Sequence, residues 1–289
     1  MAKIKVSELF YSIQGEGRYQ GVPSVFLRTF GCNFKCAGFG LPKGQLTKEV
    51  DGVAEQVAEN PDLYTTYNHL PLVSTGCDSY ASWDSRFKHL SPVLRTDTIA
   101  NTIMSLLPSK KWQDEHLVIT GGEPLLGWQR GYPDLLNHPD MQDLRELTFE
   151  TNGTQSLSPE FKDYLVMWTN SNSRNGWGDV TFSVSPKLSG SGENQDDAIK
   201  PENIMEYQDV GYTYLKFVVA NEEDVLEAID AINDYRLAGF NGPSYLMPVG
   251  GVESVYSSNN KNVALLAIKY GLRYSDRLQV PLFKNAWGT

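Results

Sequence analysis

Short apolar runs alternate with amphipathic segments along this chain, and that alternation predicts β/α units around a mostly parallel sheet. The predicted strands cover residues 24–29, 115–120, 146–150, 179–183, 214–219 and 243–247. The predicted helices cover residues 96–107, 134–136 and onward, 159–164, 222–235 and 261–270. Thr96 with Asp97, and Asn221 with Glu222, are suitable capping residues for two of these helices.

Unusual residues follow five of these strands, at the carboxyl ends where parallel α/β folds place their sites. The clearest example is residues 117–124, in which the strand Leu-Val-Ile-Thr runs into Gly121, Gly122, Glu123 and a proline. Glycine lets the backbone approach a ligand closely, and a carboxylate accepts hydrogen bonds from an ammonium group. The segment therefore favours a site for a ligand with an amino group, although a simple strand-ending turn is the alternative.

The chain contains three cysteines, Cys32, Cys36 and Cys77. The first two stand in the segment Gly-Cys-Asn-Phe-Lys-Cys, and the third opens Cys-Asp-Ser-Tyr-Ala-Ser-Trp. Three thiolates on an iron–sulfur cubane leave its fourth iron open to a non-protein ligand, whereas the alternative reading is three buried small hydrophobes. An odd cysteine count disfavours disulfides. With no signal peptide and no apolar stretch of membrane-spanning length, we expect a reducing, cytoplasmic compartment.

The cysteine arrangement resembles the radical S-adenosylmethionine superfamily, whose usual signature is Cys-x3-Cys-x2-Cys. Phe39 occupies the third position of that spacing and cannot bind iron. The residues after Cys77 match those that follow the third cysteine in the family, so residues 37–76 are interpreted as an insertion within the cluster-binding loop. The insertion has a helical pattern at 47–59, and the sequence leaves open whether it is a lid, a partner surface or a tolerated loop.

Further motifs narrow the resemblance to one family. They are Gln14-Gly15-Glu16-Gly17, Glu150-Thr151-Asn152-Gly153-Thr154, Ser183-Val184-Ser185-Pro186-Lys187, Leu215-Lys216-Phe217, Arg277-Leu278-Gln279 and Trp287-Gly288-Thr289. Together with the cysteines they resemble the 7-carboxy-7-deazaguanine synthases, with matches from Glu8 to Thr289. The resemblance implies an α/β fold, a partial (open) β/α TIM-like barrel of the radical S-adenosylmethionine type, built as a single catalytic domain over residues 1–289.

The family's reaction is the ring contraction of 6-carboxy-5,6,7,8-tetrahydropterin to 7-carboxy-7-deazaguanine with loss of ammonia, on the way to preQ0 and queuosine-type 7-deazaguanines. The resemblance therefore implies a carbon–nitrogen lyase that uses a 4Fe-4S cluster, S-adenosyl-L-methionine and Mg²⁺. In the family, a radical derived from S-adenosylmethionine removes hydrogen from the pterin and later returns it. The resemblance also implies a reductant such as flavodoxin and a homodimer.

The resemblance assigns roles only where this sequence matches the family's motifs. Cys32, Cys36 and Cys77 match the cluster ligands, and Ser79 stands where a threonine usually supplies a hydroxyl to Mg²⁺. The positions for S-adenosylmethionine are matched by Gly121, Gly122, Glu123, Glu150, Asn152, Ser183, Ser185, Pro186 and Lys187. The substrate positions are matched by Ile13, Gln14, Gly15, Arg28 and Thr120. A planar guanidinium suits a carboxylate, whereas for Glu150 and Asn152 a polar strand end is nearly as good an explanation.

Composition excludes some other classes. The formal net charge of −10 disfavours a general nucleic-acid binder, which needs a basic patch. The four histidines show no metal-ligand spacing, so we expect them to be structural or solvated. Residues 176–178 and 189–197 are rich in glycine, serine and polar residues and are predicted to be mobile loops.

Two other functions remain open. A glycyl-radical activase would share the cysteines and the Gly-Gly-Glu-Pro motif, but it is not expected to carry Gln14 to Gly17 together with Ser185 to Lys187. A non-catalytic binding or regulatory descendant is the second alternative, and Phe39 is its best support. Retention of the other motifs argues against it.

Overall fold

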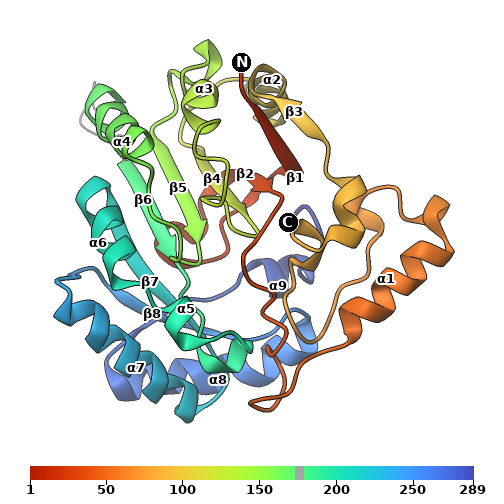
Figure 1. The fold of residues 1–289 in the computed structure, drawn as a ribbon, viewed down its shortest axis with the longest axis vertical. Helices are drawn as coiled ribbons and strands as arrows, with labels where there is room; N and C mark the ends of the chain where they lie inside the picture. The colour runs from red at the N-terminus through yellow and green to blue at the C-terminus, as the bar shows by residue number, and fades with distance from the viewer. Residues whose placement is uncertain (173–178) are drawn as a thin grey trace.

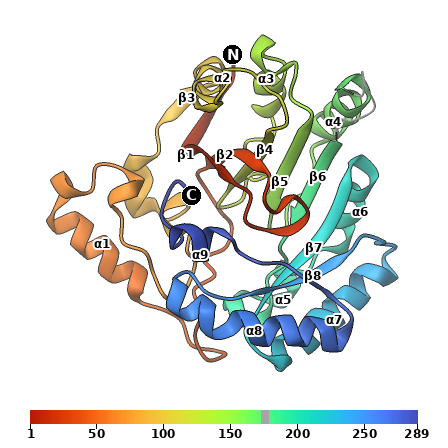
Figure 2. The same ribbon diagram turned by 180° about the vertical axis from the view of Figure 1, so that it is seen from behind.

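The computed structural model describes residues 1–172 and 179–289 (Figure 1). The predicted loop at 176–178 lies outside the described residues. Within them, one curved sheet of nine strands has helices along its outer face, and a separate lobe projects from one side. Figure 2 shows the same curved wall from behind, with the last helices running beneath it.

The strand order is β3-β1-β2-β4-β5-β6-β7-β8-β9, and among the described residues no pairing joins the two outer strands. All neighbours from β2 to β9 are parallel, whereas β1 is antiparallel to both β2 and β3. The predicted open β/α barrel is therefore confirmed. The strands are β1 Lys3–Ile13, β2 Pro23–Thr29, β3 Val93–Arg95, β4 His116–Gly121, β5 Glu146–Thr151, β6 Asp179–Val184, β7 Tyr212–Val219, β8 Ser244–Pro248 and β9 Arg273–Tyr274.

The helices follow the strands around the outside of the sheet (Figures 1 and 2). Only α1 lies in the projecting lobe, well away from the outer helices. The α-helices are α1 Glu49–Glu59, α2 Thr96–Leu106, α3 Tyr132–Leu136, α4 Pro159–Asn172, α5 Gln195–Ala198, α6 Pro201–Val210, α7 Glu222–Leu237, α8 Glu253–Tyr270 and α9 Gln279–Phe283.

All six predicted strands are present, and their boundaries shift by no more than two residues. The helices were predicted less completely. The helix expected to continue beyond residue 136 ends there, because Pro139 begins a separate 3₁₀ turn, and α4 and α8 are longer than predicted. Asn221 caps α7 as expected, its side chain accepting from the Asp224 N–H at 3.0 Å. Thr96 is not a cap, because it is already the first helical residue of α2.

Alternate residues of a strand point to opposite sides of a sheet. One set in this sheet is apolar and packs beneath the outer helices, and it includes Leu27, Ile119, Phe149, Phe182 and Phe217. The intervening set is mainly polar and lines an open cavity on the inner face, and it includes Arg28, Thr120, Glu150, Ser183 and Lys216. The hydrophobic pattern that stabilises the barrel therefore also aims the polar side chains at one shared space.

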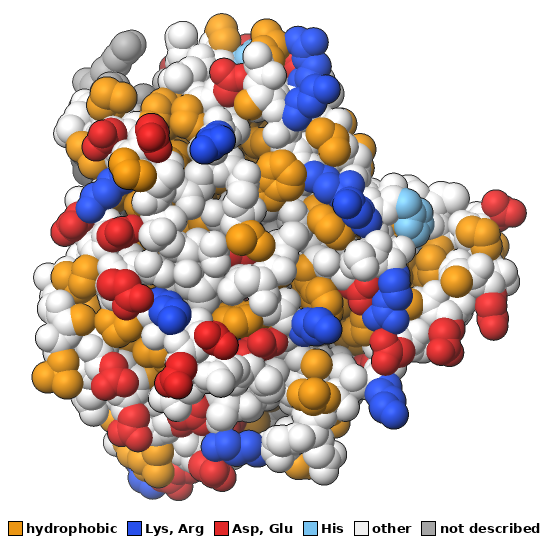
Figure 3. Space-filling model, in the orientation of Figure 1, with side chains coloured by type: hydrophobic (Ala, Val, Ile, Leu, Met, Phe, Trp, Pro, Cys, Tyr) orange, Lys and Arg blue, Asp and Glu red, His pale blue; other side chains and the backbone are white. Residues whose placement is uncertain are grey.

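Residues 37–76 fold into the projecting lobe (Figure 1), and their interpretation as an insertion within the cluster-binding loop stays a prediction. The helix predicted at 47–59 is α1. Its buried face joins a small apolar core that is separate from the main one, formed by Val50, Val53, Ala54, Val57, Tyr67, Leu70, Val73, Tyr80, Ala81 and Phe87. Figure 3 shows this lobe standing out from the body, with acidic side chains near its tip.

The two ends of the insertion meet at a neck, which we define as the backbone pairing of Phe39 with Gly76. The Gly76 N–H donates to the Phe39 carbonyl at 2.7 Å, and the Thr47 N–H donates to the Ala37 carbonyl at 2.8 Å. Gly76 has a φ of 83°, a conformation that glycine adopts without steric cost. In the described residues no helix is long and apolar enough to cross a membrane.

His116 provides a pH-dependent contribution to stability. Its side chain is fully buried, 2.7 Å from the Thr148 hydroxyl and stacked near Tyr19, and burial lowers its pKa to about 3. Between that value and the usual pKa near 6.5, the unfolded chain binds a proton that the folded chain does not, so stability falls as the pH falls.

We expect His116→Gln to flatten the loss of stability in acid. Below about pH 6 the wild-type free energy of unfolding should fall by about 1.4 kcal/mol per pH unit more than that of the variant, down to the folded pKa. Denaturant unfolding at several pH values measures this difference. Parallel curves for the two proteins would contradict the assignment.

Candidate active site

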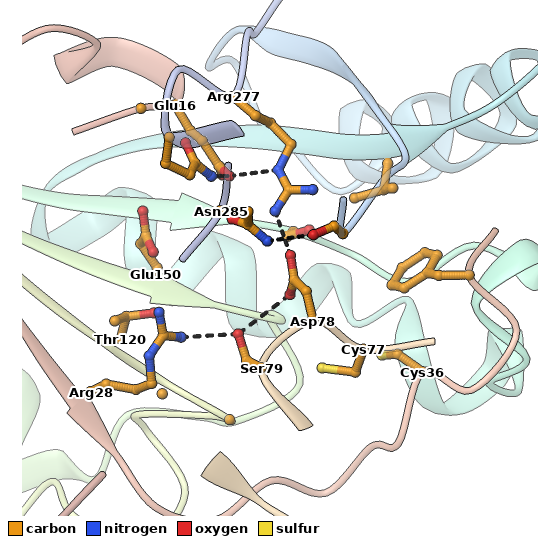
Figure 4. Close-up of a pocket in the computed structure, with 18 of the residues that line it drawn as sticks. Glu16, Arg28, Cys36, Cys77, Asp78, Ser79, Thr120, Glu150, Arg277 and Asn285 are labelled. Atoms are coloured by element: carbon orange, nitrogen blue, oxygen red, sulfur yellow. Dashed lines mark hydrogen bonds and ion pairs between the residues drawn. The ribbon is translucent and has the colours of Figure 1, made fainter. Parts of the chain in front are cut away.

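The inner cavity opens at the carboxyl ends of the parallel strands, where the sequence predicted a site (Figure 4). All but two of the predicted site residues line it. The lining residues among them are Ile13, Gln14, Gly15, Arg28, Cys32, Cys36, Cys77, Ser79, Thr120, Gly121, Gly122, Glu150, Asn152, Ser183, Ser185 and Lys187. Glu123 and Pro186 are the exceptions, because both are buried behind the cavity wall.

The three cysteines lie together despite their separation in sequence. Cys32, Cys36 and Cys77 pack in one apolar cluster with Phe34 and Phe39, and all three are free thiols. Cys77 follows Gly76 directly, so the neck of the insertion delivers it beside the other two. Phe39 occupies the third position of the Cys-x3-Cys-x2-Cys spacing, and the looped-out chain returns Cys77 to the same cluster of side chains.

Burial raises the pKa of all three thiols, that of Cys32 to about 12. Neighbouring acidic groups raise these pKa values further, since Cys77 acts on Cys32, both of these act on Cys36, and Asp78 acts on Cys77. Iron binds the deprotonated thiolate form of cysteine. An apolar pocket of three thiols therefore keeps them protonated until a cationic partner is present to stabilise the thiolates. Among residues 1–172 and 179–289, no three acidic, Cys or His side chains converge on one metal ion. A cubane places its thiolates on separate irons, and this donor set fits such a group.

The loop that carries Cys36 is fixed by Glu193, a residue that the sequence analysis did not single out. One carboxylate oxygen of Glu193 accepts from the Lys35 N–H at 2.8 Å and from the Cys36 N–H at 2.6 Å. The Gly38 N–H donates to the Ser191 carbonyl at 2.8 Å. The prediction that residues 189–197 form a mobile loop is therefore wrong: the segment is a 3₁₀ turn and the start of α5, packed under the cysteine loop.

Gly121 and Gly122 serve a close approach between two segments of the protein itself. A Cβ on Gly122 would lie 2.5 Å from the Gly31 carbonyl oxygen and 2.7 Å from the Cys32 Cβ. A Cβ on Gly121 would lie 2.5 Å from the Thr29 carbonyl oxygen. Because neither position has room for a side chain, the β4 loop can rest directly against the cysteine loop.

Glu123 ties the ends of two strands together from behind the cavity. Its carboxylate accepts from the Leu125 N–H at 3.0 Å, the Thr151 hydroxyl at 2.8 Å and the Asn152 N–H at 2.7 Å. Burial raises the pKa of Glu123, and these hydrogen bonds oppose that rise. The sequence suggested a contact between this carboxylate and a ligand's ammonium group, but most of its accepting capacity is used inside the protein.

Arg28 is the cation at the inner end of the cavity. Its Nε donates to Glu8 at 2.8 Å, and a second guanidinium nitrogen donates to the Ser79 hydroxyl at 3.0 Å. A register shift between Val6 and Glu8 in the β1–β2 pairing places Glu8 directly opposite Arg28. The pKa of Arg28 is raised: burial acts against its charge, but Glu8, Asp78 and Glu150 outweigh that effect.

A second charged group lines the opposite side of the cavity, and the sequence analysis gave its members no role. Glu16 pairs with Lys216 and, at 3.1 Å, with Arg277, and Arg277 also pairs with Asp78. Figure 4 shows the continuous path from Arg28 through Ser79, Asp78 and Arg277 to Glu16. Burial disfavours the Glu16 carboxylate, but the two cations lower its pKa to about 2. All of these residues lie in the motifs that carried the family resemblance, and that was the available signal.

Comparison with known proteins agrees with this geometry. No protein-family model matches the chain. It is 28% identical over 298 residues to the 7-carboxy-7-deazaguanine synthase of Halobacterium salinarum, covering 98% of this chain and 91% of that protein. It is 26% identical over 286 residues to the synthase of Pyrobaculum aerophilum, covering 99% and 97%. The crystal structure of QueE from Escherichia coli aligns with a TM-score of 0.50 and 19% identity, covering 94% of this chain and 93% of that one.

The fold is thus an open β/α barrel like that of QueE from Escherichia coli, with three clustered thiols lining its inner cavity. Within that class the chain resembles the 7-carboxy-7-deazaguanine synthases along nearly its whole length, and the resemblance predicted from its motifs is confirmed.

We expect Glu193→Ala to weaken cluster retention, because the backbone N–H groups of Lys35 and Cys36 would lose their acceptor. Leaving such donors unsatisfied destabilises the folded loop by about 1–3 kcal/mol. Iron and sulfide content after anaerobic reconstitution, together with the visible absorption spectrum, measures the effect. Glu193→Gln should retain more cluster because its amide oxygen still accepts. Gln195→Ala, an exposed change in the same segment, is the matched control. Equal iron content in all four proteins would rule out this role.

Proposed function

We propose that this protein is a radical S-adenosylmethionine enzyme that converts 6-carboxy-5,6,7,8-tetrahydropterin to 7-carboxy-7-deazaguanine with loss of ammonia. The observation that carries the proposal is the return of Cys77 to Cys32 and Cys36, at a cavity that also holds Arg28. Similarity to synthases of that name over 98–99% of the chain supports the same reaction.

Cys32, Cys36 and Cys77 would hold a 4Fe-4S cluster, and the neighbouring wall would hold S-adenosylmethionine. That wall consists of Gly121, Gly122, Asn152, Ser183, Ser185 and Lys187, with Glu123 and Pro186 supporting it from behind. When bound, the cluster and S-adenosylmethionine supply a carbon-centred radical. The Ser183 side chain lines the cavity beside Tyr214 and contributes a hydroxyl group to this polar wall.

The substrate would bind at the other end, with its carboxylate on Arg28. Glu8 holds the guanidinium in place through Nε, leaving its remaining N–H groups for the Ser79 hydroxyl and an anion. Gln14 donates to Glu150 at 3.1 Å, which keeps both polar side chains at the cavity surface. The salt bridge with Glu16 raises the pKa of Lys216, so Lys216 stays charged and holds its proton during turnover.

Ser79 is proposed as the Mg²⁺ ligand. Its hydroxyl lies 3.4 Å from Asp78 and 3.0 Å from Arg28, so both a carboxylate and a cation are beside it. Mg²⁺ is usually held by one or two protein oxygens, waters and a ligand's anionic group, and this sparse oxygen set fits that habit. A flavodoxin-type reductant, a homodimer and a cytoplasmic location stay predictions.

The decisive experiment is anaerobic reconstitution followed by incubation of the reduced protein with S-adenosylmethionine, Mg²⁺ and 6-carboxytetrahydropterin. We expect 7-carboxy-7-deazaguanine in the mass spectrum. Cleavage of S-adenosylmethionine without that product would favour another radical substrate, as in an activase. Failure to form any cluster would favour a non-catalytic descendant.

Two variants distinguish loss of the cluster from loss of substrate binding. Cys77→Ala should lose the cluster absorption and all activity, because only two thiolates remain. Arg28→Lys should keep the cluster but raise KM for the pterin at least about tenfold, since disrupting a buried, hydrogen-bonded charge typically costs about 2–5 kcal/mol. A Cys77→Ala protein with full absorption and turnover would exclude Cys77 as a ligand.

Ser79 can be tested by Mg²⁺ titration of the rate. Ser79→Ala should raise the Mg²⁺ concentration needed for half-maximal activity, because it removes a hard oxygen donor. Ser79→Thr keeps the hydroxyl and is the matched control. Activity that ignores both Mg²⁺ and Ser79→Ala would remove the metal from the proposal.

A further inference from the structure

The last residues of the chain turn back from α9 into the cavity wall. Lys284 and Asn285 both have positive φ, 57° and 55°, which non-glycine residues rarely adopt. The Asn285 side chain donates to the Gly251 carbonyl at 2.9 Å, and residues 285–289 line the cavity. A strained turn of this kind persists only where contacts beyond it hold the chain in place.

Those contacts come from the insertion, through Trp287. Its ring meets Tyr67 and Tyr80 edge-on, with centroids 5.4 and 5.5 Å apart. Its indole N–H donates to the Leu70 carbonyl at 3.1 Å. Tyr67 and Leu70 belong to the insertion and are buried in its own apolar core, and Trp287 packs against that core. The insertion therefore provides the Trp287 side chain with both an aromatic contact, from Tyr67, and a hydrogen-bond acceptor, from Leu70.

Gly288, the residue after Trp287, lies beside Glu8, the carboxylate that pairs with Arg28. The backbone N–H of Gly288 lies close enough to the Glu8 carboxylate to lower its pKa. Glu8 in turn pairs with Arg28 at 2.8 Å, and Arg28 donates to Ser79 at 3.0 Å. Glu8 is buried, and burial raises the pKa of its carboxyl group, although Arg28 and the Gly288 backbone oppose that rise. An unbroken series of contacts thus links the insertion to the Arg28 guanidinium.

We propose that the insertion serves as the seat of the chain's last residues, and that Trp287 is a positioning residue that fixes the Glu8–Arg28 pair. The effect on substrate rests on the proposed function, in which Arg28 binds the pterin carboxylate. Of the roles that the sequence left open for residues 37–76, this one requires no partner protein and no opening movement. It makes the inner face of the insertion part of the substrate site, although only Phe39, Gly40, Ser74 and Gly76 of the insertion line the cavity.

The test compares Trp287→Ala, Trp287→Phe and the control Leu63→Ala, which changes an exposed insertion residue that is 66% accessible. Trp287→Ala should raise KM for the carboxypterin about tenfold, equivalent to about 1.4 kcal/mol. Its kcat and cluster absorption should stay near wild type, because the seat lies at the substrate end. Trp287→Phe keeps the apolar contact and loses the indole donor, so its KM should rise less. Leu63→Ala should leave every value unchanged.

Hydrogen exchange of the reconstituted protein gives a second readout that needs no turnover. Trp287→Ala should speed exchange both in residues 284–289 and in residues 64–73 of the insertion. Unchanged exchange in the insertion, or a KM within about twofold of wild type in Trp287→Ala, would overturn the proposal. If that variant does not fold, Trp287→Phe decides it, and a KM equal to wild type overturns it.

The two proposals fail in different ways. If wild-type protein forms no 7-carboxy-7-deazaguanine, the proposed function is wrong, and the exchange measurement still decides whether the insertion seats Trp287. If wild type is active and Trp287→Ala loses kcat instead of substrate affinity, the reaction stands and the positioning role is wrong.

Discussion

Pairing of buried charge is the constraint on which this cavity depends. Arg28, Lys216 and Arg277 are largely buried cations, and each has a carboxylate partner within salt-bridge distance. The carboxylate partners come from other segments. Glu8 and Glu16 lie near the beginning of the chain, and Asp78 directly follows Cys77. The beginning of the chain, the segment after Cys77 and the segment around Arg277 must therefore converge before all of these charges are paired.

That convergence explains why the insertion is integrated with the barrel. Its neck delivers Cys77, its base rests on the segment that carries Glu193, and its apolar core receives Trp287. A segment whose role the sequence left open is joined both to the cysteine cluster and, through Trp287, to the side of the cavity that holds Arg28.

The sequence predicted the six inner strands because their apolar runs are short and bounded by turn residues. It missed β1, where polar residues interrupt the pattern and a register shift breaks the alternation. The motifs placed all but two of the candidate site residues at the cavity, but they could not show that Glu123 is buried away from it, since burial depends on the loops packed over it. Glu193 was missed because its partners are backbone N–H groups, which leave no trace in a sequence.

The neck makes the position of Cys77 in space nearly independent of its distance from Cys36 along the chain. Once Phe39 and Gly76 are paired, the length of chain between them has little effect on where Cys77 stands. The entropy of closing a flexible loop grows only with the logarithm of its length, about 0.6 kcal/mol for each doubling. A site whose motif is defined by fixed residue spacing can therefore accept a folded subdomain within that motif at modest thermodynamic cost. A search that requires the fixed spacing would overlook every protein with such an insertion.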